Sequence, residues 1–139
     1  MPRFHHRAAF QPRANIPMAT ESRDRLALEL RMAGESLIAC PSIDAYNTLS
    51  KMLAALNRAG LQDSLLDPGT NILNGICDRY EQSTSITVER EEAAELRQAL
   101  ANIDAGLHRV PLQRLARAVA EVEVFFAVGV DGPEQKEIE

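Results

Sequence analysis

The sequence has few aromatic residues, few cysteines and no long apolar run. Tryptophan is absent, and Phe and Tyr make up only 4% of the 139 residues. Proteins rich in β-sheet usually carry more aromatic and β-branched side chains than this. Two cysteines do not build a disulfide scaffold, and no apolar run reaches the roughly 20 residues needed to cross a bilayer. These shortages argue against a β-rich fold and exclude a disulfide-built or membrane-spanning chain.

The residues that are abundant favour helices. The chain contains 20 Ala and 16 Leu, which lose little conformational freedom on entering a helix. Apolar side chains recur at alternating spacings of three and four, as from Leu26 to Leu37 and from Ala93 to Leu107. The length allows one domain. We therefore predict an all-α fold, an antiparallel bundle of about five helices, over residues 20–39, 43–58, 68–82, 88–105 and 111–128.

Local signals set the ends of these helices. Pro41 ends the first helix, because its ring disfavours helical geometry in the residue before it. Ser42 then serves as the N-cap of the second helix, and Gly60 follows that helix where a left-handed conformation is often required. Asp67-Pro68 is typical of an N-cap followed by proline at the first helical position.

Two glycines fall inside predicted helices. Gly75 follows Asn74, and Asn-Gly is a strong hairpin signal where alternating strands flank it. The flanks here have helical spacing instead, so we interpret Gly75 as a place where another helix comes close, with a kink as the alternative. Gly34 in the first helix admits the same interpretation.

Charge is distributed unevenly along the chain. Residues 1–17 hold Arg3, Arg7 and Arg13 and no acidic residue, so the rest carries 12 basic against 20 acidic side chains, a net charge of −8. Binding to duplex nucleic acid relies on clustered Lys and Arg, which the acidic body lacks. The composition of residues 1–17 predicts a mobile basic arm.

The role of this arm stays open between three interpretations. It can contact nucleic acid, with Phe4 and Phe10 available to stack on bases. It can be a targeting segment, since an Arg-rich and acid-poor composition is typical of transit peptides. The third interpretation, which we favour, is a tail without function or a stretch upstream of a natural start at Met18.

Residues 18–128 are expected to form the single helical domain. Gly129, Gly132 and Pro133 are helix-ending signals, so we expect residues 129–139 to form an acidic, disordered tail. Cys40 and Cys77 stand alone, without a C-x-x-C pattern, and isolated cysteines of this kind usually behave as small buried hydrophobes. Since no secretory signal is visible, the expected location is the cytoplasm.

No motif of a common enzyme class is present. The sequence lacks the P-loop, the G-x-S-x-G elbow and the H-E-x-x-H zinc motif. Asp104 and His108 are four residues apart, as in a proton-transfer pair, but a surface or helix-end contact is the better interpretation. We predict no enzymatic activity, no cofactor and no metal site.

An acidic cluster marks the start of the fourth helix. Thr87 is its expected cap, and Glu91, Glu92 and Glu95 lie in the first turns. Carboxylates there can bind a divalent cation, but the positive end of the helix dipole favours them without any ligand. We prefer the dipole interpretation.

The fifth helix has more apolar surface than one stripe can bury. Phe125 and Phe126 are about 100° apart around a helix, so both cannot lie at the centre of one stripe. Phe126 belongs to the stripe that faces the core. The candidate interface residues are those of the second stripe, Ala118, Val124, Phe125 and Val128. This stripe is either buried in a central helix or forms an interface with a second copy or another protein.

Two functional hypotheses follow. The first is a small non-enzymatic protein-interaction module, such as an adaptor, inhibitor or chaperone-like subunit, that acts through helix-face contacts as a homodimer. The alternative is a nucleic-acid-associated accessory protein that uses the basic arm, with Arg3, Arg7 and Arg13 on phosphates. Neither hypothesis involves a membrane.

Overall fold

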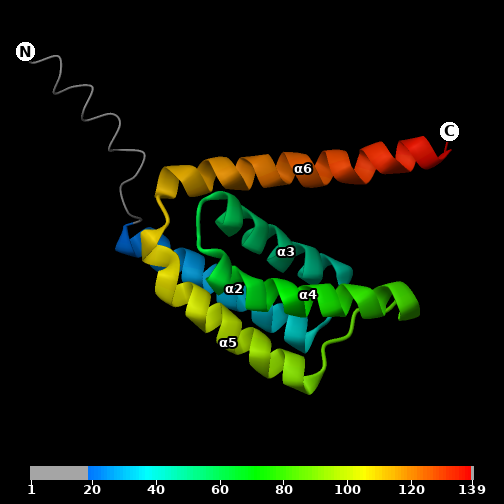
Figure 1. The fold of residues 1–139 in the computed structure, drawn as a ribbon, viewed down its shortest axis with the longest axis horizontal. Coiled ribbons are helices and arrows are strands. Elements are labelled where there is room, and N and C mark those ends of the chain that lie inside the picture. Colours follow the sequence, from blue (N-terminus) through cyan, green and yellow to red (C-terminus); the bar gives the residue numbers. More distant parts are fainter. Residues whose placement is uncertain (1–18, 139) are drawn as a thin grey trace, which may run out of the picture.

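The computed structural model describes the backbone of residues 19–138 and the side chains of residues 19–127. Within that range the chain forms α-helices and one short 3-10 helix, and no β-strand (Figure 1). The elements are α2 (Thr20–Ala39), α3 (Ile43–Arg58), α4 (Asp63–Ser83), α5 (Arg90–Gly106), η1 (Leu107–Arg109) and α6 (Leu112–Ile138). The predicted all-α helical bundle is confirmed. None of these helices is long and apolar enough to span a membrane.

Four helices form a closed body, and α6 lies outside it. α2 packs against α3, α3 against α4, α4 against α5, and α5 returns to α2. α6 packs against α3 and runs along that edge of the body (Figure 1). The last residue of α3, Arg58, pairs with Glu121, whereas Lys51 pairs with Glu123 further along α6. This reversed order makes α3 and α6 antiparallel.

The interior of the described residues is apolar throughout. It contains no buried charged or polar side chain, so its stability rests on apolar burial and helix hydrogen bonds. Leucines and isoleucines from the predicted seams supply most of the core. The largest fully buried side chains are Leu30, Leu37, Leu49, Leu56, Ile76, Leu96, Ile103, Leu107 and Val110.

The first two predicted helices have the predicted bounds, and their end signals act as expected. The Ser42 Oγ accepts a hydrogen bond of 3.0 Å from the backbone N–H of Ala45. Gly60 has a φ of 107°, and its N–H donates to the carbonyl of Asn57 while that of Leu61 donates to Leu56. These two bonds satisfy carbonyl groups that the end of α3 would otherwise leave unpaired.

α4 begins at Asp63, five residues before the predicted start, and Pro68 lies inside it. Proline lacks an N–H, but only the bond to the carbonyl of Ser64 is lost this close to the helix start. Burial favours the longer helix, because Leu66 is buried and Leu65 packs against the core. The pattern Asp67-Pro68 therefore did not mark the N-terminus.

α5 begins at Arg90, two residues after the predicted start, and its N-cap is Glu89 rather than Thr87. Glu89 and Glu92 form a capping box, in which each side chain accepts a hydrogen bond from the backbone N–H at the other position. The Glu89 N–H lies 2.9 Å from the Glu92 Oε1. Thr87 instead accepts hydrogen bonds from Arg79.

α6 continues to Ile138, ten residues past the predicted end at 128, and takes in most of the segment that we expected to be a disordered tail. Glycine weakens a helix by about 1 kcal/mol without forbidding it. The clash that proline imposes on the preceding residue involves that residue's Cβ, which Gly132 lacks. The helix-ending signals at Gly129, Gly132 and Pro133 therefore do not compel a stop.

Gly34 lies at a close approach between helices, as predicted, whereas Gly75 does not. A Cβ at Gly34 would collide with the Leu100 Cδ1, so the absence of a side chain lets α2 and α5 pack closely. A Cβ at Gly75 would meet only the Glu92 Oε2, at an ordinary contact distance of 3.5 Å. α4 runs through Gly75 without a break.

Alanine substitutions at two glycines should therefore have opposite effects on stability. Gly60→Ala forces a non-glycine residue into a positive φ and should lower the free energy of unfolding by about 1–2 kcal/mol. Gly75→Ala should raise it by up to about 1 kcal/mol, because alanine favours the helical state and the space is free. Urea unfolding followed by circular dichroism measures both, and changes of the same sign would contradict this account.

Candidate docking surface

The structure separates the four predicted interface residues of α6. Val124 is 63% exposed and Phe125 is 68% exposed. Ala118 is only 2% exposed, because it lies between Leu115 and Val122 on the stripe that faces the core. The prediction that Ala118 belongs to the interface is therefore wrong, because this residue is part of the core. The side chain of Val128 lies outside the described residues.

One narrow stripe attaches α6 to the body. Leu115, Ala118 and Val122 are buried in the core, and Phe126 packs against it, as the sequence predicted for Phe126. The Phe125 ring meets the Phe126 ring edge-on, with centroids 5.9 Å apart and planes at 74°. Phe125 thus contacts Phe126 at one side and leaves most of its surface in solvent.

Ion pairs flank this stripe. The Lys51 Nζ lies 3.2 Å from the Glu123 Oε1 and 5.4 Å from the centroid of the Phe126 ring. The Arg58 Nε lies 3.2 Å from the Glu121 Oε1. Lys51 is one third exposed and the other three side chains are about half exposed, so each pair contributes at most about 1 kcal/mol. The Arg58 pair neutralises Glu121, which lies one turn before Phe125 on the same side of α6.

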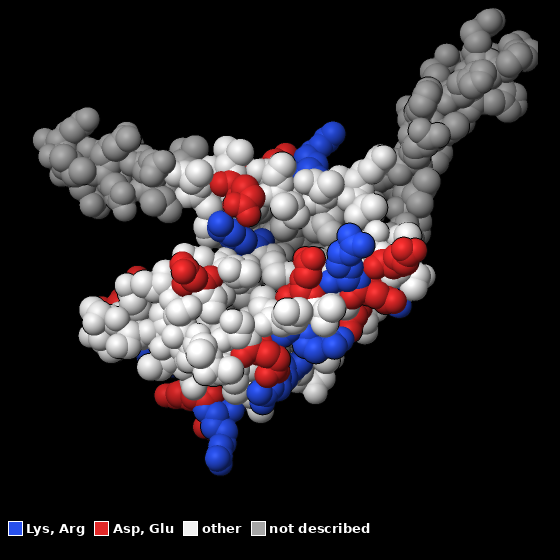
Figure 2. Space-filling view, turned by 180° about the vertical axis from the view of Figure 1, so that it is seen from behind, with Lys and Arg blue, Asp and Glu red and all other residues white. Residues whose placement is uncertain are grey.

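A groove that sequence reasoning did not find opens on the other flank of α6. It lies between α2, α3 and α6, has a volume of about 540 Å³, and opens on the face shown in Figure 2, beneath α6. Three alanines leave room between the helices, and two methionines and two valines line the walls. The apolar lining residues are Met32, Ala33, Ala45, Met52, Ala55, Val119 and Val122.

The groove leaves apolar side chains uncovered. Met32 is 60% exposed, and Val119 is 44% exposed. Glu29 and Glu123 stand on the walls, with Lys51 beside Glu123. The one sequence signal for this surface was the position of Met32 away from the apolar seam of its helix. The spacing between α2 and α6 could not be inferred from the sequence, because it depends on how both helices pack against α3.

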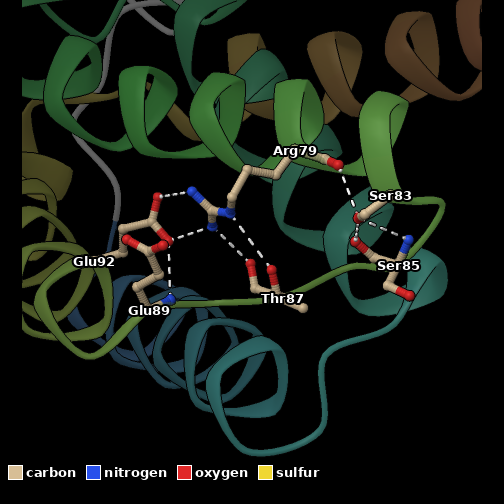
Figure 3. A network of polar contacts seen from close by, with 6 residues as sticks. All are labelled: Arg79, Ser83, Ser85, Thr87, Glu89 and Glu92. Carbon is tan, nitrogen blue, oxygen red and sulfur yellow. Dashed lines mark hydrogen bonds and ion pairs between the residues drawn. The ribbon is translucent and has the colours of Figure 1, made fainter.

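The most connected polar cluster joins α4 to the start of α5 (Figure 3). The Arg79 guanidinium donates to both carboxylate oxygens of Glu92, at 2.9 and 2.5 Å, and to the carbonyl of Thr87 at 2.8 Å. Glu92 also accepts from the Glu89 N–H. One arginine therefore holds the α4–α5 connection and the N-terminus of α5 together.

This cluster supports a structural role for Glu92. The hydrogen bond from Arg79 is the main cause that lowers the pKa of Glu92, and it raises the pKa of Arg79 in turn. Both groups are held in their charged forms and have their hydrogen-bonding groups engaged. Among the described residues no group of three His, Cys, Asp or Glu side chains is arranged to hold a metal ion.

The structure also places the predicted Asp104–His108 pair and the two cysteines. Asp104 lies in α5 and the exposed His108 in η1, and no hydrogen bond joins them in the described part of the chain. Both cysteines are free thiols. Cys40 is exposed and Cys77 is half-buried, so the prediction of buried cysteines is wrong for Cys40 and only partly met by Cys77. Burial is the main cause that raises the pKa of Tyr46 to about 12, with Cys77 adding to it.

The charged residues of the described surface are mixed in sign. Figure 2 shows acidic and basic side chains interspersed on one face of the body. The arm residues Arg3, Arg7 and Arg13 lie outside the described residues. The structure therefore does not test the hypothesis that they bind nucleic acid.

Replacing Glu92 tests the role of the Arg79 cluster. Glu92→Gln removes the negative charge and one of the two oxygens that accept from Arg79, and should lower the free energy of unfolding at pH 7 by about 1–2 kcal/mol. The matched control is Glu91→Gln on the exposed side of the same turn, which should cost only a few tenths of a kcal/mol. Equal losses in chemical denaturation would contradict this role.

The effect of Glu92→Gln should also depend on pH. Because the folded state lowers the pKa of Glu92, the unfolded chain takes up this proton first as the solution is acidified. The stability advantage of the native residue is therefore complete above the ordinary glutamate pKa of 4.5 and declines as the pH falls through the lowered value. A difference in unfolding free energy between the native chain and Glu92→Gln that stays constant from pH 7 to pH 3 would contradict this expectation.

Comparison with known proteins adds nothing to this geometry. No family model, no curated protein and no solved structure matches the chain. The candidate surface is therefore interpreted from its own residues. It consists of the two apolar sides of α6, one with the groove and one with Phe125, and the contact with α3 lies between them.

Proposed function

We propose that this protein is a non-enzymatic protein-interaction module that forms a homodimer through the outer surface of α6. The observation that carries the proposal is the exposure of Phe125 beside Val124, on a helix that the body holds by one stripe. A buried aromatic side chain removes about 150–250 Å² from water, worth several kcal/mol at about 25 cal/mol per Å². An apolar surface of this kind commonly marks an interface.

Local charge supports a second copy as the partner. The protein is acidic overall, so two copies repel each other unless the charges at their contact are neutralised. Glu121, which lies one turn before Phe125 on the same side of α6, is paired with Arg58 of α3. A two-fold contact between two α6 helices would therefore bring together apolar side chains without two unpaired carboxylates.

The groove supports a wider role as an interaction module. Val119, on the groove side, and Phe125 are six residues apart, about 120° around the helix. A dimer formed through Phe125 would thus leave the groove of each copy open. Such a dimer would present two apolar grooves, as suits an adaptor or inhibitor that binds apolar segments of other proteins.

Charge reversal at Phe125 tests the dimer. Phe125→Glu should convert a dimer of 15.3 kDa chains into a monomer, because the two-fold contact would then bury two facing carboxylates. The helical circular dichroism signal should be unchanged, since this side chain is mostly in solvent already. Size-exclusion chromatography with light scattering measures the mass.

Met32→Glu is the matched control for this experiment. It places the same charge at an apolar side chain of similar exposure in the groove, and should leave the dimer intact. A native chain that is monomeric at about 100 μM, where a micromolar dimer would be formed, would contradict the proposal. So would a dimer that Met32→Glu disrupts and Phe125→Glu does not.

A further inference from the structure

The groove between α2, α3 and α6 is suited to an aromatic side chain. Met32 and Met52 stand on its walls, and methionine sulfur makes favourable contacts with aromatic rings. Ala55, which is 3% exposed, lines the groove as well, so its apolar lining extends to the buried core. Its volume of about 540 Å³ admits a bulky apolar side chain together with part of its backbone.

The charge of the groove suits a basic segment. Glu29 and Glu123 stand on its walls against a single basic residue, Lys51, which is paired with Glu123. None of the ion pairs among the described residues includes Glu29. An occupant that combines an aromatic ring with nearby arginines would satisfy both the walls and this carboxylate.

Residues 1–18 of the chain itself have this chemistry. They carry three arginines and no acidic residue in an otherwise acidic protein. Phe10 is flanked by Arg7 and Arg13, each three residues away. An aromatic ring with a positive charge on either side is the complement of an apolar groove with acidic walls.

The length of this segment permits the contact. Met32 lies twelve residues after the start of α2 at Thr20, which is about 18 Å along the helix. Phe10 precedes Thr20 by ten residues, which span up to about 33 Å when extended. α2 and α6 both begin at the same end of the molecule, so a chain that turns back there can run along the groove (Figure 1).

We propose that residues 1–18 fold back onto their own chain and place Phe10 between Met32 and Met52. Phe10 takes this position rather than Phe4, because the shorter loop costs less conformational entropy to close. This inference does not rest on the proposed dimer, since Phe125 lies on the opposite flank of α6.

Methionine methyl signals test the contact in the full-length chain. The protein has four methionines, two of which line the groove, so a sample with ¹³C-labelled methionine methyl groups gives a simple NMR spectrum. We expect nuclear Overhauser contacts between the Phe10 ring and the methyl groups of Met32 and Met52. Phe10→Ala should abolish these contacts and shift both methyl signals, whereas the matched control Phe125→Ala should leave them unchanged.

Three results would overturn the proposal. One is the absence of contacts together with methyl signals that do not move in Phe10→Ala. Another is the appearance of the contacts only between labelled and unlabelled copies in a mixed sample, which would assign the groove to the segment of a second copy. The last is an equal shift of the Met32 and Met52 signals in Phe125→Ala. The mass of Phe10→Ala by light scattering reports on the dimer separately.

Discussion

The packing of α6 on α3 is the constraint on which the surface of this protein depends. α3 already contacts α2 and α4 in the closed body, so it offers α6 only one remaining face. α6 therefore buries a single stripe, from Leu115 to Val122, and both sides of that stripe stay uncovered. One side becomes the wall of the groove, and the other presents Phe125 to solvent.

Most of the fold was predictable from the sequence, because its end signals are local. Ser42 and Gly60 act within one turn of their own position, and α2 and α3 have the predicted bounds. The start of α4 was not predictable from Asp67-Pro68, since it depends on the burial of Leu66 against distant helices. The full length of α6 was missed because glycine and proline weaken a helix without preventing it.

The candidate site was predictable only in part, for the same reason. Two adjacent phenylalanines cannot share one stripe, so helical geometry predicts a second apolar stripe at Phe125. Its exposure depends on the position of α6 in the bundle, which only the structure gives. The groove depends on the separation of α2 and α6, which no local pattern encodes. Glu92 was read correctly as part of a helix start, but its partner Arg79 lies thirteen residues earlier and on another helix. Helix caps can be predicted from neighbouring residues, whereas contacts between helices can be identified only in the packed structure.

The most direct test of the central claim is whether the outer surface of α6 is covered by a second α6. An equimolar mixture of isotope-labelled and unlabelled full-length chains allows contacts between copies to be observed separately by NMR. This account predicts contacts between the Phe125 ring of one copy and the Val124 methyl groups of the other. A spectrum in which all contacts of Phe125 arise within one copy would contradict it.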